Sequence, residues 1–323
     1  DESLYLCTTS SGSLPVWVPT HPIPRFNIAF DYRFDTLGFF DVPKRKRALE
    51  YAARIWEEAI LSEFPSIPSD TVIQVPDPSV TRKVDVVDTL IHVSVPEIDD
   101  ILVFVASVLD DDPALASTMP NRYGTDFDAI SSETLRQQLQ SRWTSYPSQP
   151  WAGVITFNHR ALDQGNEYKW SFDTGLIGPA EPDRRVYDFT TAATHELMHV
   201  LGIHKRDPVF AHHVVEFNED IVFALEEGRI EVPATYGFAG SQTVCEFTKY
   251  LERGFQRRVL NKEEVTMPLD DDLSHPNGAL TDIPHFYALI NPTLGPTLSS
   301  VPGRLDFALL KDIGYQIATP DCL

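Results

Sequence analysis

The stretch THELMHVLGIHKRD, which begins at Thr194, carries side chains that could bind a metal ion and act on water. His195 and His199 are four residues apart, so on a helix they project from one face, about 40° apart around the axis and one turn along it. Zinc accepts imidazole nitrogens at about 2.0–2.1 Å, and a catalytic zinc site has three protein ligands and one open position. The spacing therefore predicts that His195 and His199 are two zinc ligands.

Glu196 follows the first of these histidines and lies about 100° from it around a helix. It can face the ion without binding it and accept a proton from water, whose pKa zinc lowers to about 7. We therefore assign Glu196 as the general base. A helix that spells this pattern by chance is expected in roughly one chain in a hundred. The context lowers that chance, because Asp188 can cap the helix FTTAATHELMHVLG and Gly202 can end it with a positive φ.

The third ligand does not follow from this spacing. The stretch HELMHVLGIHKRD resembles the HExxHxxGxxH signature of the metzincin zinc endopeptidases, with Gly202 three residues after His199. The position of the final histidine in that signature is Lys205 here, and His204 comes one residue earlier. A lysine amine is protonated at neutral pH, so Lys205 is no ordinary zinc ligand. His204 remains an alternative third ligand.

A segment further along the chain, PLDDDLSHPNGALTDIPHFYALINP, resembles the region that supplies the third ligand in leishmanolysin-like metzincins. In those proteins the third histidine follows a long insertion and lies shortly before the Met-turn. His275 has this placement, and ALINP at 288–292 resembles the ALM-P type of Met-turn. The resemblance implies His275 as the third zinc ligand, ahead of His204 and His285.

The Met-turn position of this chain departs from the family pattern, because Ile290 stands where the family has methionine. That methionine forms an apolar floor beneath the zinc and does not bind it. Isoleucine is apolar, but it is β-branched and lacks the flexible thioether. We therefore expect an altered floor and a weakened enzyme rather than a lost metal. The resemblance also implies that Tyr287, just before the turn, hydrogen-bonds the oxyanion, with a packed tyrosine as the alternative.

The resemblance touches both ends of the chain as well as the motif. FNIAFDYRF and ALEYAARIWEEAI are similar to the beginning of secreted bacterial relatives, and GRLDFALLKDIGY is similar to their closing helix, whereas little is recognised between Arg206 and Met267. It implies a metzincin-like α+β fold with a twisted, mostly parallel sheet. We divide the chain into a tail or pro-segment remnant (1–25), an upper catalytic lobe with the zinc-binding helix (26–203), and a mainly helical and irregular lower lobe with the Met-turn-like segment and a C-terminal helix (204–323).

Hydrophobic periodicity and turn signals place the elements that must position these residues. The run ILVFVASVL predicts a strand buried on both faces. The family resemblance implies that a substrate peptide lies along an edge strand, for which AGVITFN is the candidate. The predicted strands cover residues 26–34, 71–75, 89–95, 101–109 and 152–158. The first predicted helix begins at Pro43. The other predicted helices cover residues 131–143, 188–202, 216–228, 247–260 and 304–315.

The acidic composition limits the partners of the chain. Its 323 residues carry a formal net charge of -21 at pH 7, whereas binding phosphates requires clustered Lys and Arg, so we expect no nucleic-acid partner. We interpret the basic run KRKR at 44–47 as a solvated first helical turn rather than a nuclear address or a processing site. The longest apolar run, 101–109, is far too short to cross a bilayer, so we expect no membrane span.

Weaker signals favour a secreted, extracellular protein. The chain begins with Asp1 rather than Met, is acidic and contains many prolines. Its three cysteines allow one disulfide and leave one thiol over; they are Cys7, Cys245 and Cys322. The aspartate runs 110–112 and 270–272 either bind the structural calcium that related peptidases often carry or form solvated acidic loops, since no EF-hand loop is present.

These residues predict a zinc endopeptidase that acts on protein or peptide substrates, with zinc as its cofactor. The rival enzyme is a gluzincin, whose third ligand would be Glu219 on a helix spanning 216–228. Gly202 and the ALINP segment count against it. A catalytically weak or inactive binding protein that has kept the metzincin fold is the rival from another class, and Lys205 and Ile290 favour it. Because the cleft chooses the substrate, a hydrolase acting on other bonds also remains open.

Overall fold

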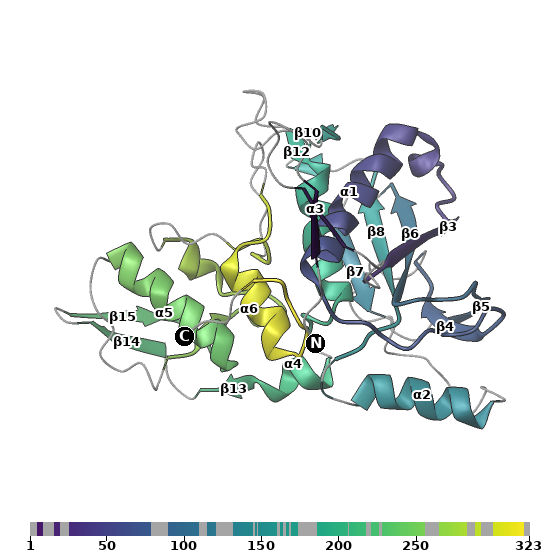
Figure 1. Ribbon diagram of the computed structural model, residues 1–323. Coiled ribbons are helices and arrows are strands. Elements are labelled where there is room, and N and C mark those ends of the chain that lie inside the picture. The colour runs from purple at the N-terminus through teal and green to yellow at the C-terminus, as the bar shows by residue number, and fades with distance from the viewer. Residues whose placement is uncertain are drawn as a thin grey trace.

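The main sheet is built around β6 (Ile101–Val108), which is buried over its first seven residues, as the apolar run predicted. It pairs in parallel with β3 (Ile28–Phe34) on one side and β8 (Ala152–Asn158) on the other. β7 (Ala116–Pro120) pairs antiparallel with β8 and completes the order β3-β6-β8-β7. The computed structural model is thus a mixed α/β protein with a mostly parallel four-stranded sheet (Figure 1).

Part of the chain lies outside this description. The structure describes residues 5–8, 16–19, 26–78, 90–109, 115–120, 132–144, 146, 148–159, 162–163, 166–167, 169–173, 186–205, 207–217, 221–225, 228–255, 265–282, 288–291 and 300–319. Six α-helices fall within these ranges. None of the six combines the length and the apolar character that crossing a bilayer requires.

One face of the sheet is covered by α1 (Pro43–Ala59) and α3 (Phe189–Val200), which pack against each other (Figure 1). Pro43 is the first residue of α1, where its missing N–H removes no helical hydrogen bond, as predicted. Val103 and Val105 of β6 point toward these helices and join their apolar residues in one core. The alternation of side chains along β6 therefore serves two cores, one on each face.

The opposite face of the sheet buries Leu102 and Phe104 of β6 in a second core. This core is closed by the hairpin of β4 (Val72–Pro76) with β5 (Leu90–Ser94) and by α2 (Glu133–Thr144). All three elements were predicted from the sequence. The two strands pair with each other, however, and do not join the main sheet.

The helix that carries the histidines, α3, is buried along its whole length, since each of its twelve residues is buried. The indole Nε1 of Trp56 on α1 donates to the carbonyl oxygen of Thr194 at 3.0 Å. On the sheet side, Gly153 of β8 allows a close approach: a Cβ at this position would lie 2.9 Å from both γ-carbons of Val200. The helix is therefore fixed between α1 and the sheet.

The edge of the sheet differs from the sequence prediction. AGVITFN forms β8 as a strand, but β8 lies between β6 and β7 and has no free edge. The edge strand on this side is β7, which the sequence analysis did not predict. Its residues carry mixed polar and apolar side chains, and Pro120 at its end cannot donate a ladder hydrogen bond, which suits an edge position.

The chain after α3 contains more strand than predicted. The expected helix at 216–228 is wrong, because β14 (Ile221–Leu225) and β15 (Gly228–Val232) form an antiparallel hairpin there. Ile221 and Val222 are β-branched, which favours a strand, and Phe223 is fully buried in the core. The glutamates and leucine nearby suggested a helix by propensity alone, and pairing with β15 overrode that preference.

The remaining elements after residue 207 pack beside the main sheet, with α5 and α6 next to each other (Figure 1). The helices at 247–260 and 304–315 were predicted; α5 begins earlier, at Ser241, and residues 256–264 lie outside the described ranges. Cys245 on α5 is disulfide-bonded. The elements are α4 (Pro208–His212), α5 (Ser241–Phe255), α6 (Arg304–Asp312) and a three-stranded sheet of β13 (Val214–Glu216), β16 (Tyr236–Phe238) and β17 (Met267–Leu269).

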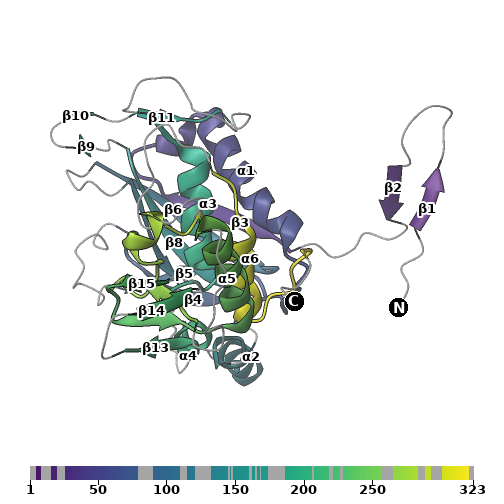
Figure 2. The ribbon, with the colours of Figure 1, turned by 90° about the vertical axis from the view of Figure 1, so that its left-hand side faces the viewer.

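Several short elements complete the description. Figure 2 shows β1 (Tyr5–Thr8) and β2 (Val16–Pro19) as an antiparallel hairpin apart from the other elements, within the stretch interpreted as a tail. The others are β9 (Leu162–Asp163), β10 (Asn166–Glu167), β11 (Lys169–Ser171), β12 (Val186–Asp188) and the 3-10 helices η1 (Phe39–Asp41) and η4 (Gly278–Asp282).

The basic run at the start of α1 is less solvated than predicted. The guanidinium of Arg45 lies 4.4 Å from the centre of the Phe39 ring, and the ammonium of Lys46 lies 4.5 Å from the centre of the Tyr32 ring. Cation–π contacts of this kind stabilise the charge against an aromatic face. Two of the four basic residues therefore cover aromatic side chains of the fold.

We expect Gly153→Ala to destabilise the protein by about 1–3 kcal/mol, because the new methyl group would overpack the contact with Val200. Combining it with Val200→Ala should cost less than the sum of the two single substitutions, since the smaller side chain relieves the clash. Gly278→Ala is the matched control, because a Cβ there meets no atom within 4 Å. Urea unfolding of the four variants measures these effects, and equal destabilisation by Gly153→Ala and Gly278→Ala would contradict the expectation.

Candidate metal centre

Both ends of α3 have the capping interactions that the sequence predicted. The Asp188 carboxylate accepts from the backbone N–H groups of Thr190 at 3.2 Å and Thr191 at 3.3 Å. At the other end Gly202 has φ of 113°, its N–H donates to the His199 carbonyl, and the next N–H donates to the Met198 carbonyl. This is the Schellman pattern, which ends a helix at one residue.

The two histidines of α3 approach each other as their spacing predicts. The Nε2 atoms of His195 and His199 are 3.2 Å apart, and their rings are nearly perpendicular, at 80°. Both residues are buried. The helix therefore presents two imidazole nitrogens at one point.

His275 brings a third imidazole to the same point from the loop after β17. Its Nε2 lies 3.1 Å from that of His199 and 3.3 Å from that of His195. Within the described ranges, these three residues form the group whose ligand atoms are close enough together to hold one metal ion. His204 is not a member of it, although its ring centre lies 6.3 Å from that of His199.

Backbone carbonyl groups orient the two helical histidines. The Nδ1 of His195 is 2.8 Å from the Leu289 carbonyl oxygen, and the Nδ1 of His199 is 2.7 Å from the carbonyl oxygen of Ile203. A carbonyl oxygen can only accept, so each Nδ1 carries the hydrogen. Each Nε2 is then the unprotonated nitrogen of a neutral imidazole.

A carboxylate orients His275 in the same way. Its Nδ1 lies 2.5 Å from Oδ2 of Asp272, whose Oδ1 accepts from the backbone N–H of Ser274. Burial is the largest single influence and raises the pKa of Asp272, but the hydrogen bond and charge of His275, together with the backbone N–H groups of Ser274 and His275, hold that pKa below its ordinary value. A carboxylate behind a histidine is the usual arrangement where that histidine binds a metal.

The three converging nitrogens fit a tetrahedral metal ion. The three Nε2 atoms are separated by 3.1–3.3 Å, and those of His195 and His199 present their lone pairs to the point where the rings meet. A tetrahedral zinc ion with bonds of about 2.0–2.1 Å places its nitrogen ligands about 3.3 Å apart. The donor set and its spacing therefore fit zinc, with one coordination position left for another ligand.

The surroundings keep the helical imidazoles neutral. Burial, followed by the proximity of His275, lowers the pKa of His195 to about 3. Burial, followed by His275 and His195, lowers the pKa of His199 well below its ordinary value. At neutral pH both side chains are in the form that binds metals.

Glu196, the residue that the sequence indicates as the general base, lies beside the histidines. It is 8% exposed, and its Oε2 accepts from the hydroxyl of Thr118 on β7 at 2.6 Å. The same hydroxyl lies 3.1 Å from the backbone carbonyl oxygen of Glu196. Glu196 is not a member of the three-histidine group.

The Met-turn-like segment holds His195 through its backbone. Leu289, whose carbonyl accepts from His195, and Ile290 both donate their N–H groups to the carboxylate of Asp306, at 3.1 and 3.2 Å. The N–H of Gly303 donates to the same carboxylate at 2.7 Å. Burial raises the pKa of Asp306 to about 6, although these three donors favour its charged form. The fully buried Ile290 side chain belongs to the core next to this turn.

Other predicted site residues are not placed or have another role. Glu219, Tyr287 and His285 lie outside the described residues, as does the aspartate run 110–112. In the run 270–272, the outer two carboxylates accept hydrogen bonds within the loop, Asp270 from Gly278 and Asp272 from Ser274 and His275. Asp270 and Asp272 therefore support the His275 loop through these hydrogen bonds.

A cavity of about 300 Å³ opens beside the three histidines. Its lining includes residues of the edge strand β7 and of the His275 loop, and its volume would admit a short piece of an extended chain. The lining residues are Ala116, Ser117, Thr118, His195, Glu196, His199, His204, Lys205, Asp272, Ser274 and His275.

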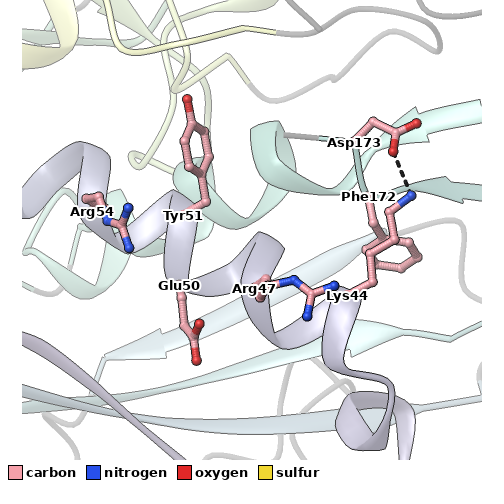
Figure 3. Close-up of a pocket in the computed structure, with 7 residues that line it drawn as sticks. All are labelled: Lys44, Arg47, Glu50, Tyr51, Arg54, Phe172 and Asp173. Carbon is pink, nitrogen blue, oxygen red and sulfur yellow. Dashed lines mark hydrogen bonds and ion pairs between the residues drawn. The ribbon is translucent and has the colours of Figure 1, made fainter. Parts of the chain in front are cut away.

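A larger hollow of about 420 Å³ lies on the outer face of α1 (Figure 3). Its charged side chains reach water, and the ion pair between Lys44 and Asp173, at 2.6 Å, joins two half-exposed groups. The described residues of its lining include no histidine or cysteine, so they offer neither the imidazole nor the thiolate ligands that transition metals favour. The lining residues are Lys44, Arg47, Glu50, Tyr51, Arg54, Phe172 and Asp173. The smaller cavity beside the histidines is therefore the candidate functional site.

Three supporting residues were missed by the sequence analysis. Asp272 stands three residues before His275 in an acidic run, which is the one signal that could have indicated it. Asp306 stands at the third position of α6 after Gly303, a capping position, but its bonds to 289 and 290 are long-range. Nothing in the local sequence of Thr118 points to Glu196.

We expect His275→Ala to lose tight zinc binding, because one of three imidazoles is removed. His204→Ala should retain one zinc ion per chain. Elemental analysis of the dialysed variants by mass spectrometry measures the zinc content. The opposite pattern, with His204→Ala empty and His275→Ala loaded, would make His204 the ligand.

The depressed pKa of His195 predicts how the metal-free protein responds to acid. Between about pH 6.5 and its folded pKa of about 3, the unfolded chain binds a proton that the folded chain does not, so stability falls as the pH falls. For a single group the slope is at most about 1.4 kcal/mol per pH unit. In the presence of a chelator, the unfolding free energy of the native chain should approach that of His195→Gln as the pH is lowered from 6.5 to 4.5. Parallel urea-unfolding profiles of the two chains would contradict this.

The chain matches no family model and no curated protein. Its function is therefore inferred from the arrangement of its own side chains.

Proposed function

We propose that the chain is a zinc-dependent endopeptidase, in which His195, His199 and His275 hold the ion and Glu196 is the general base. The observation that carries the proposal is the convergence of three Nε2 atoms within 3.1–3.3 Å of one another, next to a carboxylate outside their group. Each imidazole donates its Nδ1–H to an oxygen, so the lone pair on its Nε2 is available to a metal ion. Three histidine ligands, with a glutamate nearby that does not bind the metal, suit a hydrolytic zinc site.

The residues of the chain divide the reaction between them. A zinc ion held by the histidines would polarise the scissile carbonyl and acidify the attacking water. Glu196 accepts one proton from that water while the oxygen of the water adds to the carbonyl carbon of the substrate. Glu196 then returns the proton to the amide nitrogen as the C–N bond breaks, which releases a carboxyl group and an amine.

The edge strand β7 supplies the surface for a peptide substrate. It is paired with β8 on one side, and its residues Ala116, Ser117 and Thr118 line the cavity beside the histidines. An extended peptide can add to an exposed sheet edge through main-chain hydrogen bonds. We therefore assign this role to β7 in place of β8, which lies inside the sheet.

The resemblance to metzincins agrees with this arrangement in two places. A mixed α/β fold with a mostly parallel sheet surrounds the histidine helix, and the segment at 288–291 lies behind His195. Because Ile290 replaces the methionine of the family's turn, we propose a weakened metzincin-type enzyme. The gluzincin alternative loses its main support, since residues 221–225 form a strand where it needs a helix.

We also propose that the protein is extracellular. Cys245 is disulfide-bonded, and disulfides persist mainly in oxidising compartments. The strongly acidic composition, with a net charge of -21, suits a soluble exported enzyme.

We expect Glu196→Gln to lower the rate of casein cleavage by at least about a hundredfold, because an amide cannot accept the proton from water. Its zinc content should equal that of the native chain. Glu63→Gln is the matched control, since Glu63 is exposed and does not line the cavity; it should cleave at the native rate.

Two results would contradict the proposal. One is a Glu196→Gln protein with the native cleavage rate. The other is a folded, zinc-loaded native chain that cleaves neither denatured casein nor shorter peptides, which would favour the non-catalytic binding protein instead.

A further inference from the structure

We propose that Thr118 is a positioning residue for the reaction, because its hydroxyl fixes the carboxylate of Glu196 from the neighbouring strand. This inference rests on the proposed function, in which Glu196 is the general base. Thr118 does not belong to the three-histidine group, and no local sequence signal connects it with Glu196. The two residues are 78 positions apart in the chain and meet through the packing of β7 against α3.

The hydrogen bond between them has the geometry of a charge-assisted contact. Thr118 Oγ1 lies 2.6 Å from Glu196 Oε2, within the range of about 2.5–2.7 Å for a hydroxyl that donates to an anionic oxygen. The backbone carbonyl oxygen of Glu196 is further away, at 3.1 Å. A hydroxyl carries a single proton, so the shorter contact receives most of it.

Both partners are well suited to hold a fixed geometry. Thr118 is β-branched, so its hydroxyl has few rotamers, and it sits on a strand that is paired with β8. The backbone of Glu196 belongs to the fully buried α3. The glutamate side chain has three rotatable bonds and would otherwise sample several orientations at an entropic cost on ordering. The threonine therefore selects one orientation of the carboxylate.

The orientation matters because a general base must lie within hydrogen-bond reach of the proton it accepts. A displacement of about 1 Å can lower a rate by about a hundredfold. Thr118 also lines the cavity and belongs to the strand assigned to the substrate. One residue thus sets the position of the base relative to the edge along which a peptide would lie.

The test compares two substitutions at this position. Thr118→Val removes the hydroxyl and keeps the β-branched shape, whereas Thr118→Ser keeps the hydroxyl and removes the methyl group. We expect Thr118→Val to lower kcat for a casein-derived peptide by about tenfold to a hundredfold, with KM changed less than about threefold. Thr118→Ser should restore kcat to within about threefold of the native value.

A matched control accounts for the general effect of losing a threonine hydroxyl. Thr248 on α5 donates its hydroxyl to the Val244 carbonyl at 2.8 Å and does not line the cavity. Thr248→Val should leave kcat unchanged. Zinc content and the unfolding midpoint, measured for all variants, show whether Thr118→Val has kept its fold. If it has not, Thr118→Ala replaces it, with Thr118→Ser again as the rescue.

A second readout does not depend on activity. In crystals of the native chain and of Thr118→Ser, each prepared without zinc, the Glu196 carboxylate should take one ordered orientation with Oε2 bonded to residue 118. In Thr118→Val we expect a different rotamer or several rotamers.

Three outcomes would overturn the role of Thr118. They are a native kcat in Thr118→Val, an equal loss of kcat in Thr118→Val and Thr118→Ser, or a Glu196 carboxylate that remains in place and ordered in the valine variant. A native enzyme that hydrolyses no peptide would overturn the proposed function instead, and the crystals without zinc would still decide whether Thr118 positions Glu196.

Discussion

The orientation of the three imidazoles depends on the hydrogen bonds made by their outward-facing Nδ1 atoms. Each bond ends on an oxygen from a different segment: Ile203 three residues after the end of α3, the turn at 288–291, and the acidic run before His275. Together they place the three Nε2 atoms within 3.1–3.3 Å of one another, on two buried histidines and one partly buried histidine. Without them the rings could rotate and present the wrong nitrogen, so the chemistry proposed for the site depends on these three acceptors.

The sequence predicted the parts of the site that depend on local signals. The cap at Asp188, the glycine end at Gly202 and the spacing of the two helical histidines all act within one helix, and all three are present. The buried strand β6 was equally clear from its apolar run. His275 was indicated by a resemblance rather than by any local pattern, and the structure brings it to the other two histidines.

The remaining features depend on contacts between distant segments, which composition and periodicity do not encode. The edge strand β7 has no strong alternation, and its identity as an edge follows from how the sheet is assembled. The segment at 221–232 contains helix-favouring glutamate and leucine, yet it pairs as a hairpin that buries Phe223. The link between Thr118 and Glu196 and the bonds from Asp306 to the turn are of the same long-range kind.

The turn whose Leu289 carbonyl orients His195 is held in place by Asp306 of α6, which accepts from the N–H groups of that turn. Asp306 comes more than a hundred residues after the histidine helix. During translation, α3 therefore leaves the ribosome long before the helix that secures its ring. His275 also arrives late, so a nascent chain carries its glutamate and two histidines without a complete metal site. The order of synthesis thus delays assembly of the proposed metal site until α6 has been made.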